Sequence, residues 1–367
     1  MPDETRRAIV RAGMVGAVAS LAPWADPASC EAQSREGAMA GMKRTVEFPG
    51  FFDLQVNGFA GVDFGDPALT PEQVLHAVEA IGQTGVTRFL PTLITSSLET
   101  FAACARTLVR EKHPAIAGLH MEGPYISPED GPRGAHSRAF VRDADVDDFR
   151  RRQGAADGRI RLLTVAPEAP GVLRVIEHAA GSGVRVAIGH TGATGAQVAD
   201  AVSAGATLST HLGNGCAQML PRHPNVIWEQ LAADRLMASF IVDGHHLPSA
   251  TVKSMIRAKT PGRSLLVTDA IAAAGMPPGR YKLGGQEVEL SPKGRVAVPG
   301  APNLAGSALR LDVAIGNTVR FTGLSLEDVA PMASTRPAEY VGIPTAGRVV
   351  AEWDTVAFAL RVVRVAG

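Results

Sequence analysis

Four residues of this chain could hold a divalent metal ion and use it, and each directly follows a short apolar run. Glu122 follows IAGLHM, His190 follows VRVAIG, His211 follows ATLST and Asp269 follows SLLVT. Two imidazoles and a carboxylate are a natural ligand set for a divalent cation such as zinc, and a catalytic zinc site keeps one further position open for water. Asp269 could then be the general base that takes a proton from that water.

Each of these residues also has a purely structural interpretation. Glu122 could shape the Glu-Gly-Pro turn, and Asp269 could cap the helix that follows it. His190 and His211 could be core histidines with satisfied hydrogen bonds. Chance could place any one of these residues at the end of an apolar run, but it is much less expected to place all four there. We therefore predict a metal-dependent catalytic site.

The apolar runs themselves are typical of strands, and they predict how the four residues come together. From residue 50 onward, runs rich in Val, Ile, Leu, Phe and Thr cover 51–58, 86–93, 116–123, 161–168, 184–190, 206–212, 236–244 and 264–270. Amphipathic stretches separate most of them, such as 71–85, which Thr70 could cap. Eight strand–helix repeats favour an α/β fold, a (β/α)8 TIM-like barrel, over an open doubly wound sheet. Catalytic residues of such barrels lie at the carboxyl ends of the strands.

Three further segments predict β-structure beside the barrel. Residues 281–300 have the pattern of two or three antiparallel strands joined by GG and PKG turns. With 43–50 and 349–365 they could form one small β-layer. The predicted domains are therefore a (β/α)8 barrel over 51–345, which carries the metal site, and a small β-sandwich domain, complete or reduced, from 43–50 and 346–367.

The first 42 residues differ from the rest of the chain. TRRAIVRAGMVGAVASLAPWADPA loosely follows the layout of a twin-arginine export signal. The alternatives are a disordered segment or a mis-assigned start, with Met39 or Met42 as the true first residue.

The bulk composition favours a cytoplasmic enzyme. Three cysteines lie far apart without a C-x-x-C pair, which fits reduced thiols better than a disulfide framework. Acidic and basic residues are equal in number, 36 each, so nothing suggests a nucleic-acid partner. No apolar segment reaches the roughly 18–20 residues that a membrane span requires.

The ordered motifs of the chain resemble those of the N-acetylglucosamine-6-phosphate deacetylase family, within the amidohydrolase superfamily. From about residue 47 to about residue 345, they are FPGFFDLQVNGFAGVDF, LHMEGPYIS with RGAH, AIGHTGAT, STHLGNGCAQM, IVDGHHLP, LVTDAIAAAG and NLAGSALRLDVAIGN. The resemblance implies a homodimer that hydrolyses the acetamide of N-acetylglucosamine 6-phosphate to glucosamine 6-phosphate and acetate.

The resemblance also implies a single metal ion. Gln55 and Asn57 stand where related barrels often carry His-x-His, which would leave a second metal position vacant, and RLLTVAPE offers no lysine for carbamylation. The implied ligands are Glu122, His190 and His211. Zinc is the expected ion, with iron, cobalt or manganese as alternatives.

Substrate contacts are implied by position in the same motifs. Asp269 matches the catalytic aspartate, and His136 would hold the carbonyl oxygen as negative charge develops on it. The implied substrate-binding residues are Ala135 and His136 at the acetamido group, Asn214, Gly215, Arg222 and His246 near the phosphate, and Leu304, Ala305 and Gly306 in a loop over the sugar.

Other functions stay open on the sequence. One is an amidohydrolase that acts on another N-acyl amino sugar or on a cyclic amide, although such enzymes usually keep His-x-His and a bridging lysine. Another is a barrel that only binds a sugar phosphate, which would give no reason to keep Asp269 beside three metal ligands. The sequence does not decide between glucosamine and galactosamine derivatives.

Overall fold

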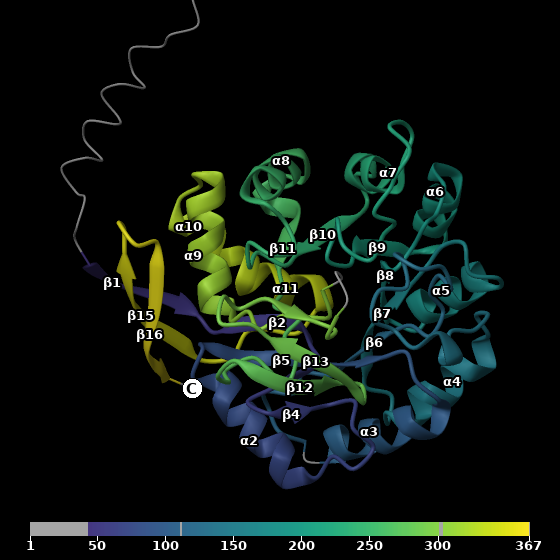
Figure 1. Cartoon of the computed structure of the whole chain (residues 1–367), viewed down its shortest axis with the longest axis horizontal. Helices are drawn as coiled ribbons and strands as arrows, with labels where there is room; N and C mark the ends of the chain where they lie inside the picture. The colour runs from purple at the N-terminus through teal and green to yellow at the C-terminus, as the bar shows by residue number, and fades with distance from the viewer. Residues whose placement is uncertain (1–42, 111, 301–303, 367) are drawn as a thin grey trace, which may run out of the picture. The chain divides into compact units, whose positions relative to one another are not determined.

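The computed structural model describes residues 43–110, 112–300 and 304–366, and Figure 1 shows their arrangement. The three interpretations of residues 1–42 lie outside the described residues. None of the helices within those ranges is both long enough and apolar enough to cross a membrane.

Eight parallel strands form the central sheet, and each overlaps an apolar run that predicted it. In sheet order they are β11 (Ser264–Leu266), β10 (Met237–Phe240), β9 (Ala206–Ser209), β8 (Arg185–Ile188), β7 (Ile160–Val165), β6 (Leu119–Glu122), β5 (Val86–Ile94) and β2 (Phe51–Val56). All six residues of β2 are buried, as expected for a strand covered on both faces.

The two outer strands of this sheet, β2 and β11, meet and nearly close it into a barrel. A parallel bridge joins Val56 to Ala270, and the Asn57 N–H donates to the Ala270 carbonyl at 2.7 Å. Slightly earlier in both segments, the Thr268 hydroxyl donates to the Asp53 carboxylate at 2.6 Å. The prediction of a (β/α)8 TIM-like barrel is confirmed.

Helices surround the strands, as Figure 1 shows. They are α2 (Pro71–Gly82), α3 (Leu98–Arg110), α4 (Val146–Ala155), α5 (Val172–Gly181), α6 (Gly195–Ala204), α7 (Val226–Ala232), α8 (Ser249–Lys259) and α9 (Leu311–Thr322), followed by α10 (Leu326–Val329) and α11 (Thr335–Val341). Helix α2 shows how the sequence specifies them. Thr70 and Gln73 form the reciprocal bonds of a capping box, and the helix buries Val74, Ala77, Val78 and Ile81, which are spaced to share one face.

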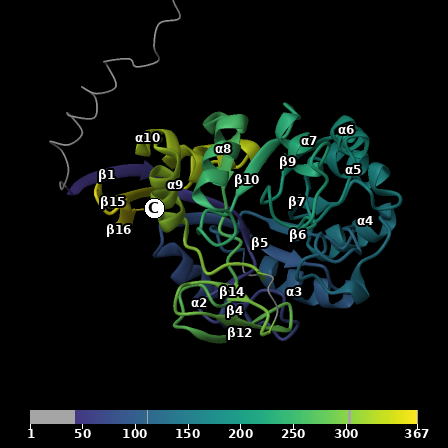
Figure 2. The same cartoon turned by 45° about the horizontal axis from the view of Figure 1, so that its top comes forward.

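Besides a two-stranded pair, β3 (Gly58–Phe59) with β4 (Val62–Asp63), two three-stranded antiparallel sheets lie apart from one another (Figure 2). One joins the chain ends: β1 (Lys43–Pro49), β15 (Arg348–Asp354) and β16 (Ala359–Ala366). The other joins β12 (Gly279–Leu283), β13 (Gln286–Leu290) and β14 (Val296–Ala297), which follow β11 in the chain. The small chain-end domain of the predicted fold is confirmed, whereas the domain boundaries at 50/51 and 345/346 stay a prediction.

The prediction that 281–300 would share one β-layer with the chain ends is wrong, and apolar packing explains why. The β12–β14 sheet buries Leu283, Val288, Leu290 and Val296 in a separate cluster with Ile271. The chain-end sheet instead buries residues such as Val349 and Trp353 in the main core. Two different apolar surfaces therefore hold the two sheets.

Candidate active site

The four residues singled out by their chemistry lie where four barrel strands end. Glu122 is the last residue of β6, and His190, His211 and Asp269 follow β8, β9 and β11 within three residues. These last three residues adopt left-handed backbone conformations, with φ of +52°, +30° and +50°. Such conformations are uncommon outside glycine and concentrate at functional sites.

Three donor atoms converge at the centre of this face. The Nε2 atoms of His190 and His211 lie 3.2 and 3.1 Å from Glu122 Oε1, and 3.2 Å from each other. The corners of such a triangle lie about 1.8 Å from its centre, slightly less than a zinc–nitrogen bond of about 2.0–2.1 Å. Glu122 Oε1 and the two Nε2 atoms are therefore close enough together to hold one divalent cation, and the donor set fits the predicted metal.

His136 offers a competing third ligand. Ligand atoms of Glu122, His136 and His190 all lie within 4.8 Å of one another. However, His136 Nε2 lies 3.8 Å from Glu122 Oε2, on the other carboxylate oxygen, whereas His211 Nε2 is 3.1 Å from Oε1. The tighter geometry favours His211 as the ligand and leaves His136 beside the metal position.

The proton of neutral His136 can be placed from its neighbours. The Thr95 N–H donates to His136 Nδ1 at 3.4 Å, and the Thr95 hydroxyl lies 2.8 Å from the same nitrogen. A nitrogen that accepts from an N–H carries no proton of its own, so Nε2 bears the proton. Burial, reinforced by the charge of His190, holds the pKa of His136 well below its usual value, which keeps the ring neutral. His136 thus presents one N–H donor to the site.

Electrostatics at the cluster favour a charged Glu122. Burial by itself raises the pKa of Glu122, but hydrogen bonds from His190 and His211 outweigh it and hold that pKa well below its usual value. Burial lowers the pKa of His190, and its bond to Glu122 reverses the effect, so this pKa is raised. Glu122 is therefore a carboxylate at neutral pH and can offer an oxygen atom to a cation.

Gln55 and Asn57, predicted to mark a vacant second metal position, place their amide groups beside Glu122 and Asp269. Gln55 Nε2 donates to both Glu122 Oε1, at 2.9 Å, and Asp269 Oδ1, at 3.1 Å. Asn57 Nδ2 donates to the same Asp269 oxygen at 2.6 Å. The two amides hold one oxygen of Asp269, so its other oxygen can face a reactant. Burial and the neighbouring Glu122 charge raise the pKa of Asp269 to about 6.

A cavity of about 500 Å³ opens onto these groups. Among the residues predicted for substrate binding, those that line it are Ala135, His136, Asn214, Gly215, His246, Leu304 and Gly306. Ala305 is buried, with 1% of its surface exposed. Arg222 is exposed, in the loop between β9 and α7, and does not line the cavity. The structure thus brings together most of the predicted residues and leaves Arg222 outside.

Several residues that support the site escaped the sequence analysis. Asp243 Oδ2 lies 2.7 Å from His246 Nδ1 and fixes that ring, a pairing that the VDGHH spacing could have suggested. Thr95 is the first residue after β5, the same strand-end position that singled out the others. Leu283 lines the cavity from β12, and no local signal reveals where that hairpin packs.

The fold and the site define a class of proteins, and comparison with known proteins agrees. The chain belongs to the amidohydrolase family, whose family model matches residues 46–360.

Within that family, the relatives are amino sugar phosphate deacetylases. This chain is 37% identical to N-acetylglucosamine-6-phosphate deacetylase from Homo sapiens over 313 residues, which are 80% of this chain and 74% of that relative. It is 33% identical to N-acetylgalactosamine-6-phosphate deacetylase from Escherichia coli O157:H7 over 80% of this chain and 78% of that one.

A solved structure gives the same relationship. It is a mutant N-acetyl-D-glucosamine-6-phosphate deacetylase from Mycobacterium smegmatis, in complex with N-acetyl-D-glucosamine-6-phosphate. It matches with a TM-score of 0.80 and 31% identity, over 87% of this chain and 86% of that one. The resemblance in the ordered motifs is therefore confirmed.

Proposed function

We propose that this chain hydrolyses the acetamide of N-acetylglucosamine 6-phosphate and releases acetate and glucosamine 6-phosphate. The observation that carries the proposal is the convergence of Glu122, His190 and His211 on one point, in the same cavity as Asp269. The named activities of the relatives supply the substrate.

Glu122 Oε1 and the Nε2 atoms of His190 and His211 would hold one divalent cation. When bound, such a cation acts as a Lewis acid toward the acyl carbonyl and lowers the pKa of water at the site. We favour zinc, and this donor set also accepts iron, cobalt or manganese.

The protein residues divide the remaining chemistry. Asp269 takes a proton from the attacking water and then passes it to the departing amine nitrogen. Gln55 and Asn57 keep the Asp269 carboxylate in the orientation for both transfers. The His136 Nε2–H donates a hydrogen bond to the carbonyl oxygen as negative charge develops on it.

The sugar phosphate would lie against Asn214, Gly215 and His246, with Leu304 and Gly306 also lining the wall of the cavity. Ala305 would support that wall. We include Arg222 as a phosphate contact, since its guanidinium suits phosphate geometry. A homodimer in the cytoplasm belongs to the same proposal, and size-exclusion chromatography with light scattering checks the oligomeric state.

Acetate release from purified, metal-loaded protein tests the proposal. N-acetylglucosamine 6-phosphate, its galactosamine epimer and unphosphorylated N-acetylglucosamine would be compared at equal concentrations. We expect strong preference for a phosphorylated sugar. Faster release from the galactosamine compound would move the assignment to the activity named for the E. coli relative. No release from any of the three, with metal bound, would contradict the proposal.

A further inference from the structure

A second, larger cavity lies beside the catalytic one and has no part in the proposed reaction. Its volume is about 800 Å³, against about 500 Å³ for the catalytic cavity. Five residues line both cavities: Ile94, Gly134, Ala135, His136 and Leu304. Thr95, which bonds to His136, also lines this cavity. We call it the side cavity.

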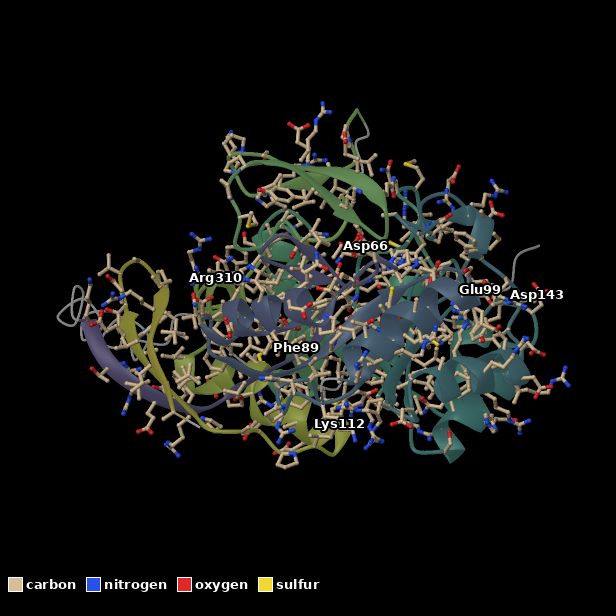
Figure 3. All side chains as sticks on the ribbon, turned by 90° about the horizontal axis from the view of Figure 1, so that it is seen from below. Asp66, Phe89, Glu99, Lys112, Asp143 and Arg310 are labelled. Carbon is tan, nitrogen blue, oxygen red and sulfur yellow. The ribbon has the colours of Figure 1, made fainter. Side chains whose placement is uncertain are left out.

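The side cavity changes character from its depth to its rim. Its inner wall includes Leu93 of β5 with Phe101 and Cys104 of α3, each with no more than 2% of its surface exposed. Its outer part includes Asp66, Lys282 and Gln286. Figure 3 labels Asp66, which lies close to the β12–β13 hairpin. The apolar surface that an aliphatic chain could reach comes from the half-buried Ile94 and Val298 and the exposed Phe140, with polar groups at the opening.

His136 relates the side cavity to the scissile amide. Its Nε2 faces Glu122 Oε2 at 3.8 Å, and its Nδ1 is held by Thr95 of the side cavity. A carbonyl oxygen bound to the His136 N–H leaves two substituents on the carbonyl carbon. If the sugar lies against Asn214, Gly215 and His246, the amide nitrogen is on the sugar side of the carbonyl carbon. The acyl substituent would then point past His136.

We propose that the side cavity receives the acyl substituent, and that the chain hydrolyses amino sugar phosphates whose N-acyl chains are longer than acetyl. This inference rests on the proposed function, because it takes the sugar to lie in the catalytic cavity. The reaction keeps its balance for every chain length. The water oxygen bonds to the acyl carbon, the carbon–nitrogen bond breaks, and the proton passes to the amine, which leaves a carboxylate.

The size of the expected effect follows from burial. A methyl pocket that closes around acetyl rejects one extra methylene by about 10–200-fold. An open apolar cavity instead gains about 0.8 kcal/mol, about fourfold, for each methylene that it buries. Longer acyl chains should therefore be retained as substrates rather than excluded.

The test compares kcat/KM for glucosamine 6-phosphate carrying N-acetyl, N-propionyl, N-butyryl and N-hexanoyl groups, by measuring release of the free amine. We expect the propionyl and butyryl compounds to stay within about tenfold of the acetyl compound. Normal acetyl hydrolysis with a loss above about 100-fold at propionyl would overturn the side-cavity inference and leave the proposed function standing. Hydrolysis of none of the four would overturn both.

Two variants of α3 provide a matched comparison. Thr100 lines the side cavity, so Thr100→Phe should lower the butyryl-to-acetyl ratio of kcat/KM by about tenfold or more. Arg106 is exposed on the same helix and outside the cavity, so Arg106→Phe should leave that ratio unchanged. Equal ratios in the two variants would contradict the inference. If Thr100→Phe fails to fold, the acyl series on the unmodified protein decides alone.

A variant of Lys282 tests whether the acyl chain or the sugar phosphate occupies the side cavity. If the acyl chain occupies it, Lys282→Met leaves the preference for phosphorylated over unphosphorylated acetyl substrate unchanged. A loss of that preference by tenfold or more would place the sugar phosphate there instead and overturn the inference.

Discussion

At the scale of single residues, the site depends on groups whose protons are placed by neighbours. Thr95 fixes the proton of His136, and the amides of Gln55 and Asn57 fix one oxygen of Asp269. Each of these arrangements supplies an oriented group before substrate arrives, which is how preorganised sites lower a reaction barrier.

Asp269→Asn should lower kcat by about a thousandfold or more, because an amide cannot accept and return a proton. Its oxygen can still accept from Gln55 and Asn57, so metal content and melting temperature should stay near those of the unmodified protein. Acetate release and elemental analysis of the purified variant check this. Substantial activity in a metal-loaded variant would remove Asp269 from the role of base.

Thr95→Val should lower kcat about tenfold or more with little change in KM, because His136 Nδ1 loses the hydroxyl at 2.8 Å and keeps only the longer bond from the Thr95 backbone N–H, so the ring is held less firmly. Thr95→Ser keeps the hydroxyl and should recover most of the activity. Steady-state kinetics on both variants provide the measurement. Equal losses in the valine and serine variants would point to packing rather than to the hydroxyl.

The value of kcat/KM should fall at acid pH. The pKa of Asp269 is raised from 3.8 to about 6, so at pH 5 the folded protein carries a protonated Asp269 that cannot act as a base. Activity should therefore rise with pH and level off above pH 6, and a bound cation would move the midpoint lower. A midpoint above pH 7 would assign the limb to another group.

At the scale of elements, local sequence signals predicted what local forces decide. Apolar runs located all eight barrel strands, and Thr70 with Pro71 located the start of α2. The packing partner of the β12–β13 hairpin was not predictable, because alternating apolar residues show that one face is buried but not which surface covers it. The same reason hid Thr95 as the partner of His136, since 41 positions separate them in the chain.

Thr70→Ala should lower the free energy of unfolding by about 1 kcal/mol, because α2 loses its N-terminal cap. Activity should be unchanged, since Thr70 lies outside the lining of the catalytic cavity. Denaturant unfolding gives the value. Thr107→Ala, within α3, is the control, and it should be neutral or slightly stabilising. A larger loss in the control would exclude capping as the cause.

At the scale of the whole molecule, the metal site ties distant parts of the barrel together. Glu122, His190 and His211 come from β6 and the segments after β8 and β9, and their side chains are buried. A cation that binds only the folded state stabilises it in proportion to the logarithm of its concentration.

Removal of the metal with a chelator should abolish acetate release and lower the melting temperature by several degrees. Re-addition of zinc should restore both. His211→Ala is the control variant, and its melting temperature should respond far less to zinc. An unchanged melting temperature of the unmodified protein, despite confirmed loss of metal, would argue against the Glu122–His190–His211 site.

Because β2 and β11 close the barrel, catalysis depends on synthesis of the chain through the last barrel strand. Gln55 and Asp269 are 214 positions apart in the chain, yet they share a hydrogen bond. Asp269 can therefore bond to Gln55 only after both the first and the last barrel strands, β2 and β11, have folded into place. Until then one edge of β2 stays unpaired and can misassemble. A nascent chain that has not reached residue 269 can hold the three metal ligands in sequence but not the acid–base group, so we expect it to be catalytically silent.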